Sequence, residues 1–237
     1  MKHFITLILS LFISLTIHSQ SYILSTSDGE LSSALVNDIF QDHLGVVWIA
    51  TEDGLTRFDG VKFYTYKHKN GDERSLAHNL VRCVTEDREG NLYVGTHHGL
   101  QCFDRAKNKF TPIAKDDKGK LLVGNVNKII QLTNGEVWAT GNDLFRAELQ
   151  GNELLAKPTD FKGPHAYLQD IIEDKDGNIW VSHLQDGIFV CKKKSKAVKH
   201  YLSDKKDVNF MQLEADANGN VFAGTNVLGG LRYDKAK

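Results

Sequence analysis

Short apolar runs alternate with polar turns along almost the whole chain after residue 21. The stretch DHLGVVWIATEDGLTRFDG, residues 42–60, shows the unit: a polar turn, an apolar run ending at Thr51, a second turn and another short run. Short runs rich in β-branched and aromatic residues, bounded by turns that contain Gly and Asp, are typical of β-strands. Helical periodicity is almost absent from this region, so the pattern predicts an all-β fold.

The unit recurs five times at a spacing of 42 to 45 residues. Each copy has an aromatic residue after its first turn, preceded by a Gly three positions earlier: Trp48, Tyr93, Trp138, Trp180 and Phe222. An Asp stands six positions before the aromatic in four copies, whereas the third copy has Leu132. An Asp-x-x-Gly sequence favours a tight turn, because the Asp side chain accepts hydrogen bonds from its own turn and Gly readily adopts positive φ.

Each copy therefore predicts about four short antiparallel strands, the content of one blade of a β-propeller. An apolar pair precedes every first turn, and a Thr or Ser with a following Gly-Leu or a close variant marks the second turn in most copies. We place the propeller at residues 20–237, with blade cores near residues 31–66, 76–111, 121–155, 163–202 and 205–234. The recurring aromatic is expected to fill the gap between neighbouring blades.

The fifth copy stops before any outer strand, whereas residues 22–24 resemble an outer strand without a blade. Either five blades close into a ring, or the chain is the first part of a larger propeller. We expect the larger propeller, since an open arc exposes a blade face and nothing after Asp234 resembles a cap.

The first nineteen residues differ from the repeats. Lys2 and His3 precede an apolar segment, residues 4–17, which is too short to span a bilayer and is followed by small and polar residues. This pattern predicts a signal peptide, residues 1–19, cleaved after Ser19, with an uncleaved membrane anchor as the alternative. The mature protein is expected to be periplasmic or secreted and to have no membrane span.

Charge and cysteine content exclude several classes of function. The chain has 237 residues and a formal net charge of −1, so it lacks the basic surface of a nucleic-acid-binding protein. The one cationic cluster, Lys192–Lys194 with Lys196, is interpreted as a solvated strand edge or turn. The three Cys have no zinc-binding spacing, and a bridge between Cys83 and Cys102 is not expected although neighbouring strands could allow it. Residues 174–178 fit the repeat turn rather than a calcium loop.

The pattern V-x-x-I-x-x-D-x-x-G-x-x-W-x-x-T-x-x-G-L, residues 36–55, resembles the two-component regulator propeller repeat. The resemblance covers residues 22–234, although the third copy lacks the Asp and the Gly-Leu pair. It implies the extracytoplasmic sensor half of a hybrid two-component system, many of which detect polysaccharide breakdown products. It also implies a second propeller or a dimer partner. The chain contains no kinase motif, so the resemblance implies a non-catalytic input module.

Ligand contacts are expected in the short turn after each Thr or Ser, because these turns vary while the scaffold repeats. The candidate residues are Glu52, Asp53, His97, His98, Asn142, Asp143, His183, Gln185, Asp186 and Asn226. Their carboxylates, amides and imidazoles suit a hydroxyl-rich ligand such as an oligosaccharide. The three His come from copies that are not adjacent, so neither a metal nor another cofactor is expected.

Two other functions are considered. A free-standing secreted interaction module with five closed blades is the main alternative. A propeller lyase or hydrolase is a weaker one, because no base or carboxylate pair at a fixed separation is evident. The longest polar insertion, residues 67–78, either covers a face, contacts a partner or is a solvated loop.

Overall fold

The computed structural model describes residues 24–27, 29–205 and 207–234. The expected signal peptide and most of the expected extra outer strand, Tyr22 and Ile23, lie outside the described residues. Where the chain is described, no helix is long and apolar enough to cross a membrane.

Nineteen strands form five antiparallel sheets in the described part of the chain, and each sheet corresponds to one copy of the repeat. The first sheet holds β1 (Val36–Gln41), β2 (Val47–Thr51), β3 (Gly54–Phe58) and β4 (Phe63–Tyr66). The second holds β5 (Val81–Glu86), β6 (Leu92–Thr96), β7 (Gly99–Asp104) and β8 (Lys109–Phe110). The third holds β9 (Val126–Gln131), β10 (Val137–Gly141), β11 (Leu144–Gln150) and β12 (Glu153–Pro158).

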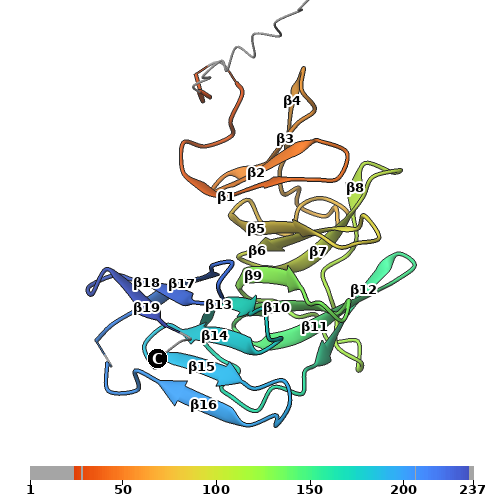
Figure 1. The fold of residues 1–237 in the computed structure, drawn as a ribbon. Coiled ribbons are helices and arrows are strands. Elements are labelled where there is room, and N and C mark those ends of the chain that lie inside the picture. Colours follow the sequence, from red (N-terminus) through yellow and green to blue (C-terminus); the bar gives the residue numbers. More distant parts are fainter. Residues whose placement is uncertain (1–23, 28, 206, 235–237) are drawn as a thin grey trace, which may run out of the picture.

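The fourth sheet holds β13 (Leu168–Glu173), β14 (Ile179–His183), β15 (Ile188–Cys191) and β16 (Val198–Tyr201), and the fifth holds β17 (Phe210–Ala215), β18 (Val221–Thr225) and β19 (Gly230–Tyr233). Strands pair in sequence order within every sheet. The first strands, β1, β5, β9, β13 and β17, contact one another in succession and form the inner side of an arc of blades (Figure 1). The predicted all-β architecture of propeller blades is confirmed.

The Asp of the repeat holds both its turn and the aromatic. Asp42 Oδ1 accepts hydrogen bonds from the backbone N–H groups of Leu44 and Val46, at 3.0 and 2.9 Å. Its Oδ2 accepts one from Trp48 Nε1 at 2.8 Å, and Asp174 does the same for Trp180. The turn needs a Gly at its fourth position, where φ is +80° in the first copy.

The third copy reaches the same result with a different residue. Leu132 cannot accept a hydrogen bond through its side chain, and Glu136 accepts the one from Trp138 Nε1 at 3.1 Å instead. The carboxylate of Glu136 also forms an ion pair with Arg146 at 2.6 Å. Glu136 therefore replaces the missing Asp as the acceptor for the indole. Its carboxylate comes from the residue after the Gly of the turn, whereas the Asp of the other copies comes before that Gly.

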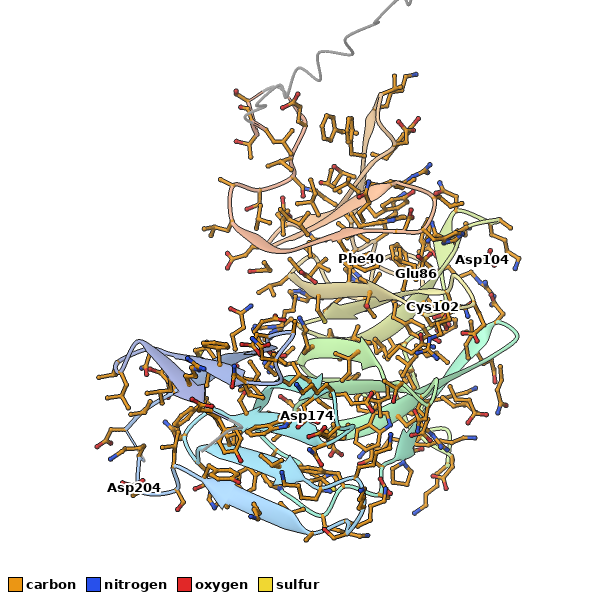
Figure 2. The ribbon with its side chains drawn as sticks, in the orientation of Figure 1. Phe40, Glu86, Cys102, Asp104, Asp174 and Asp204 are labelled. Carbon is orange, nitrogen blue, oxygen red and sulfur yellow. The ribbon has the colours of Figure 1, made fainter. Side chains whose placement is uncertain are left out.

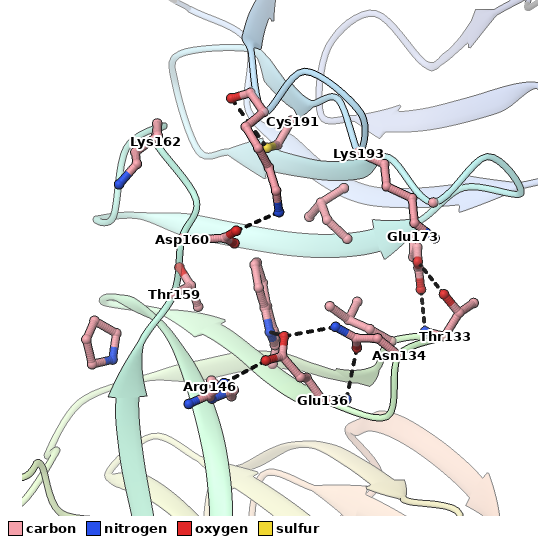
Figure 3. Close-up of a pocket in the computed structure, with 16 residues that line it drawn as sticks. Thr133, Asn134, Glu136, Arg146, Thr159, Asp160, Lys162, Glu173, Cys191 and Lys193 are labelled. Carbon is pink, nitrogen blue, oxygen red and sulfur yellow. Dashed lines mark hydrogen bonds and ion pairs between the residues drawn. The ribbon is translucent and has the colours of Figure 1, made fainter.

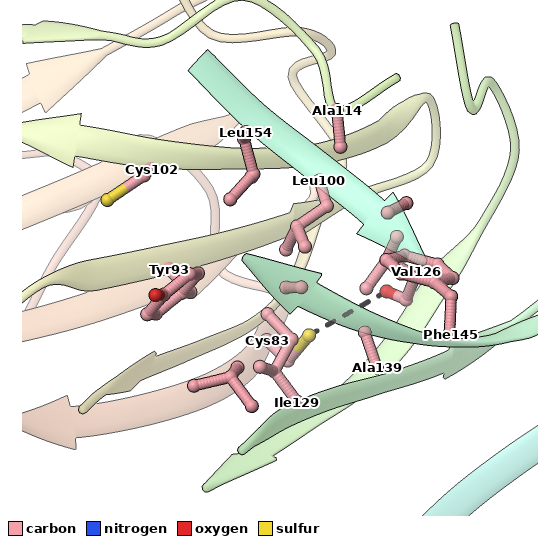
Figure 4. Close-up of a cluster of buried hydrophobic side chains, with 13 residues drawn as sticks. Cys83, Tyr93, Leu100, Cys102, Ala114, Val126, Ile129, Ala139, Phe145 and Leu154 are labelled. Atoms are coloured by element: carbon pink, nitrogen blue, oxygen red, sulfur yellow. Dashed lines mark hydrogen bonds between the residues drawn. The ribbon is translucent and has the colours of Figure 1, made fainter. Parts of the chain in front are cut away.

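Four hydrophobic clusters lie between successive blades and form the core. Figure 4 shows the cluster between the second and third blades, where Tyr93 and Leu100 meet Val126, Ala139 and Phe145. Figure 2 shows side chains filling the spaces between neighbouring ribbons. The aromatic residue of each of the first four copies is at most 4% exposed, which confirms that it fills the gap to the next blade.

The two end faces of the arc are uncovered. Phe222 in β18 is 40% exposed, because no sixth blade packs on it among the described residues. At the other end Ile39 is 64% exposed, whereas Ile129 and Ile171 at the same repeat position are buried. The five described blades therefore do not close into a ring (Figure 1).

This difference predicts that the same substitution has a larger effect on stability in the fourth blade than in the first. Ile171→Val removes a methyl group from a fully buried side chain and should lower the free energy of unfolding by about 0.5–1.5 kcal/mol. Ile39→Val at the same position of the first blade should change it by less than about 0.5 kcal/mol, since Ile39 faces solvent. Urea unfolding of the two variants checks this, and equal losses would contradict an uncovered first blade.

Candidate functional site

The turns expected to bind a ligand lie at one end of every blade. Antiparallel pairing places the turn between the second and third strands of a blade at the same end as the connection to the next blade. We call this end the loop face. It comprises residues 52–53, 97–98, 142–143, 184–187 and 226–229, with the connections 67–80, 111–125, 159–167 and 202–209.

Thr side chains close these turns and leave the intervening side chains free. Thr51 Oγ1 donates a hydrogen bond to the carbonyl of Gly54 at 2.9 Å and accepts one from the N–H of Asp53. Thr96 makes the same pair of bonds with Gly99 and His98. Both Thr are fully buried, so the backbone of these two turns is held in the same way while their exposed residues differ.

The first turn contacts the long connection to the second blade. Asp53 forms an ion pair with Lys67 at 2.5 Å and accepts a hydrogen bond from Asn79 Nδ2 at 3.0 Å. Glu52 beside it is exposed. The connection packs on the second blade, because the buried amide of Gln101 bonds the backbone of Ala77 and Ser75. The insertion of residues 67–78 thus covers part of the loop face.

Four His gather at the second turn, of which sequence analysis identified two. The rings of His97 and His78 are 5.3 Å apart, and His78 Nδ1 accepts a hydrogen bond from the N–H of Leu80. Burial lowers the pKa of His78, and the neighbouring imidazoles of His97, His98 and His68 lower it further. His98 and His68 line a cavity of about 280 Å³. His68 and His78 lie on the connection and not in the repeat turn, so the repeat pattern alone does not identify them.

The third turn has one contact of the expected kind. Asp143 lies 3.2 Å from His165 of the following connection, and the N–H of Asn142 bonds the carbonyl of Asn125. The Asp143 and His165 side chains are both about half exposed. This turn therefore presents a carboxylate and an imidazole together.

The fourth and fifth turns are arranged similarly. Asp186 lies 3.7 Å from His200, and His183 Nδ1 accepts a hydrogen bond from the N–H of Gln185. Burial lowers the pKa of His183. Asn226 Oδ1 accepts a hydrogen bond from the N–H of Asn209 at 2.8 Å. The ten candidate residues are therefore distributed over five blades of one face, each contacting its own blade or the adjoining connection.

The described residues contain no group of three or more His, Cys, Asp and Glu side chains arranged to hold a metal ion. The three Cys are free and buried, with Cys83 and Cys102 on strands separated by β6, so the two form no bridge. Burial raises the pKa of the Cys102 thiol to about 12, which leaves it unreactive at neutral pH.

Sequence analysis missed a cavity of about 620 Å³ between the third and fourth blades (Figure 3). None of the ten candidate residues lines it. Its walls include the third copy's Leu132, Glu136 and Arg146, so the departure of this copy from the repeat was the signal available in the sequence.

Comparison with known proteins agrees with the repeat and the fold. A family model for the two-component regulator propeller matches residues 30–53, 75–98 and 162–185. Each matched segment runs through the first and second strands of a blade to its loop-face turn. The matched copies are the first, second and fourth, which retain both the Asp of the first turn and the Gly of the second.

Histidine kinase P4 of Formosa agariphila is 27% identical to the chain over 217 residues, which cover 68% of the chain and 16% of the kinase. The chain therefore spans about one sixth of this curated relative. The extracellular domain of a hybrid two-component system from B. thetaiotaomicron superposes with a TM-score of 0.74 and 23% identity, over 90% of the chain and 30% of that domain. Virginiamycin B lyase from Staphylococcus aureus superposes with a TM-score of 0.57 and 14% identity, over 84% of the chain and 69% of the lyase. The first, second and fourth copies therefore match the repeat of the two-component regulator propeller family.

Proposed function

We propose that the chain is a non-catalytic, extracytoplasmic ligand-binding propeller that acts as the input module of a two-component regulatory system. The match of three repeats to the two-component regulator propeller carries this proposal. The similarity to part of a histidine kinase and to an extracellular domain of a hybrid two-component system supports it. An extracytoplasmic location also accords with the signal peptide expected from residues 1–19.

We place the ligand on the loop face and propose that it is a glycan fragment. Thr51, Thr96 and Thr225 hold the backbone of their turns, while side chains such as Asp53, His98 and Asp143 differ in chemistry from blade to blade. Hydroxyl groups of a sugar both donate and accept hydrogen bonds, which suits mixed carboxylates, amides and imidazoles. Binding discriminates among sugars when a wrong one leaves such groups unpaired.

A propeller fold does not by itself imply catalysis, because unrelated functions share it. The lyase that superposes on the chain shares the fold at 14% identity. The chain's carboxylate–imidazole pairs, Asp143 with His165 and Asp186 with His200, lie on partly exposed surface. Desolvation, which would strengthen general acid–base chemistry, is weak there. Ligand recognition is the function that this arrangement supports better.

The proposal predicts saturable binding of oligosaccharides without turnover. We expect isothermal titration calorimetry against a panel of neutral and acidic oligosaccharides to find a ligand. Its affinity should fall about tenfold or more in the variant in which His97 and His98 are both Ala, the loss expected when buried hydrogen bonds are removed. His43→Ala is the matched control, since His43 is an exposed imidazole in the β1–β2 turn at the opposite end of the first blade.

Three results would reject the proposal. Product formation from a bound sugar, detected by chromatography, would identify an enzyme. Tight binding to another protein with no affinity for any oligosaccharide would identify a free-standing interaction module. An equal loss of affinity in His43→Ala and in the loop-face variant would remove the loop face as the binding site.

A further inference from the structure

The cavity between the third and fourth blades is bounded by three turns at the end opposite the loop face and by the connection that follows β12. The turns β9–β10, β13–β14 and β15–β16 contribute Asn134, Gly177 and Lys193, respectively (Figure 3). The end of β12 and the segment after it contribute Pro158 and Lys162. Its volume of about 620 Å³ falls within the range of small-molecule sites, about 300–1,000 Å³.

The corresponding gap between the first and second blades is filled by an ion-pair network. Arg105 follows β7 and bonds Asp42 at 2.7 Å and Glu86 at 2.6 Å. It also approaches the carbonyl of Gly90 in the turn of its own blade. The guanidinium of Arg105 therefore forms ion pairs with two carboxylates, one from each of the two neighbouring blades.

Lys193 occupies the repeat position of Arg105 in the fourth blade, two residues beyond the last pair of the β14–β15 ladder. One of the two carboxylates is missing there, because Leu132 stands in place of Asp42. Glu173, the counterpart of Glu86, accepts hydrogen bonds from the Thr133 N–H and hydroxyl at 2.6 and 2.7 Å, as Glu86 does from the N–H and ring of His43. The Lys193 ammonium therefore lacks the Asp partner that the repeat supplies to Arg105.

Four cationic side chains line the cavity. Arg146 pairs with Glu136, and Lys196 pairs with Asp160 at 2.6 Å (Figure 3). Lys162 and Lys193 line the cavity from opposite sides, and both residues are exposed (Figure 3).

The walls also carry polar atoms without partners. The Arg146 Nε and the Thr159 hydroxyl are buried and have no hydrogen-bond partner among the described residues. Buried polar groups in proteins are nearly always bonded, so these two atoms are available to a ligand or to water. Leu132, Trp138 and Ile179 add an apolar surface next to them.

We propose that this cavity binds a sugar acid. Its carboxylate contacts the ammonium groups of Lys162 and Lys193, and its hydroxyls bond the Arg146 Nε and the Thr159 hydroxyl. The apolar face of the ring lies on the side chains of Trp138 and Ile179. The proposal goes beyond the function proposed above, because none of the loop-face candidate residues lines this cavity.

Calorimetric titration of the chain with D-glucuronate and D-galacturonate tests this site, with glucose and galactose as the neutral counterparts. We expect saturable binding of at least one uronate and no detectable binding of its neutral counterpart. Binding should weaken as sodium chloride is raised, since exposed ammonium groups are screened by salt. No binding of either uronate, or equal binding of the neutral sugar, would overturn the proposal.

Variants locate the site. Lys193→Gln and Lys162→Gln should each weaken uronate binding about tenfold, the effect of removing one charged hydrogen-bond partner. Lys194→Gln removes the same charge from the same turn but outside the cavity, and should leave binding unchanged. Equal weakening by Lys194→Gln would mean general attraction to the cationic turn and would reject a built site.

Two further arms separate this site from simpler explanations. Inorganic sulfate should bind more weakly than the uronate, because it cannot use the hydroxyl contacts, and equal affinity would reject a sugar acid as the ligand.

The loop-face double variant of His97 and His98 should bind uronate normally. A loss there would instead place the uronate on the loop face. Failure of the proposed loop-face function would leave this result unchanged, so the two proposals are tested independently.

Discussion

Trp48→Ala is expected to lower the free energy of unfolding by about 3–5 kcal/mol, the range for removing a large aromatic side chain from a core. Trp48 is fully buried between the first and second blades, and its ring packs edge-on against Phe103 with centroids 5.1 Å apart. The substitution removes this contact area and leaves a cavity that the stiff sheets on either side cannot close. Urea unfolding followed by far-ultraviolet circular dichroism measures the change.

Phe222→Ala is the matched control, since Phe222 holds the same repeat position in the fifth blade but is 40% exposed. We expect its loss to be about 1 kcal/mol or less, as for a partly solvated side chain outside a closed core. A loss at Phe222 equal to that at Trp48 would show that its face is covered in solution.

Asp42→Ala is expected to lower the free energy of unfolding by about 2–3 kcal/mol, because it leaves the buried Trp48 Nε1 without an acceptor and frees two backbone N–H groups of the turn. Arg105 keeps its ion pair with Glu86, so the guanidinium is not stranded. The same measurement of urea unfolding quantifies the loss.

Asp216→Ala in the fifth blade is the comparison for this prediction. Asp216 bonds the N–H groups of Asn218 and Asn220 like the other copies, but its aromatic partner is Phe222, which has no group to donate. We therefore expect a smaller loss, about 1 kcal/mol. Equal losses for Asp42→Ala and Asp216→Ala would show that the bond to the indole contributes nothing.

The same carboxylate makes stability depend on pH. Burial opposes ionisation of Asp42, but hydrogen bonds from Trp48 and Arg105 outweigh it and hold the pKa of Asp42 below its ordinary value. A carboxyl with a lowered folded-state pKa contributes stability above its unfolded pKa, about 3.9, and this is lost as pH falls through the folded value. Asp42→Ala should therefore lose more stability at pH 6 than at pH 2. An equal loss at both pH values would contradict this.

Much of the fold could be predicted from the sequence, because the same pattern of turn and strand residues occurs five times. Asp, Gly and the aromatic recur at fixed spacing, and the contacts that build the turn are local: Asp42 bonds the N–H groups of its own turn and the indole of Trp48, six residues away. Such contacts depend on the turn sequence and hardly on the rest of the chain. The strand content of each blade and the burial of the aromatic were therefore predictable.

The candidate sites could be predicted only in part from the sequence repeat. The repeat correctly indicated which turns share one face, but His68 and His78 join His97 and His98 only through the path of a long connection. The cavity between the third and fourth blades was missed because the third copy lacks the Asp of the repeat. In the sequence, Leu132 is only a departure of one copy from the pattern, and Lys193 is one of several lysines in a polar turn.

The sequence by itself determined the repeating unit, its all-β content and the position of each turn, since these depend on interactions within about twenty residues. Only the tertiary structure decided which residues of different blades meet. Whether Lys193 meets the carboxylate that Arg105 meets depends on Leu132 of the preceding blade, and whether Ile39 is buried depends on a blade before it. Those contacts join residues some forty positions or more apart in the chain, and they arise only when whole blades pack face to face.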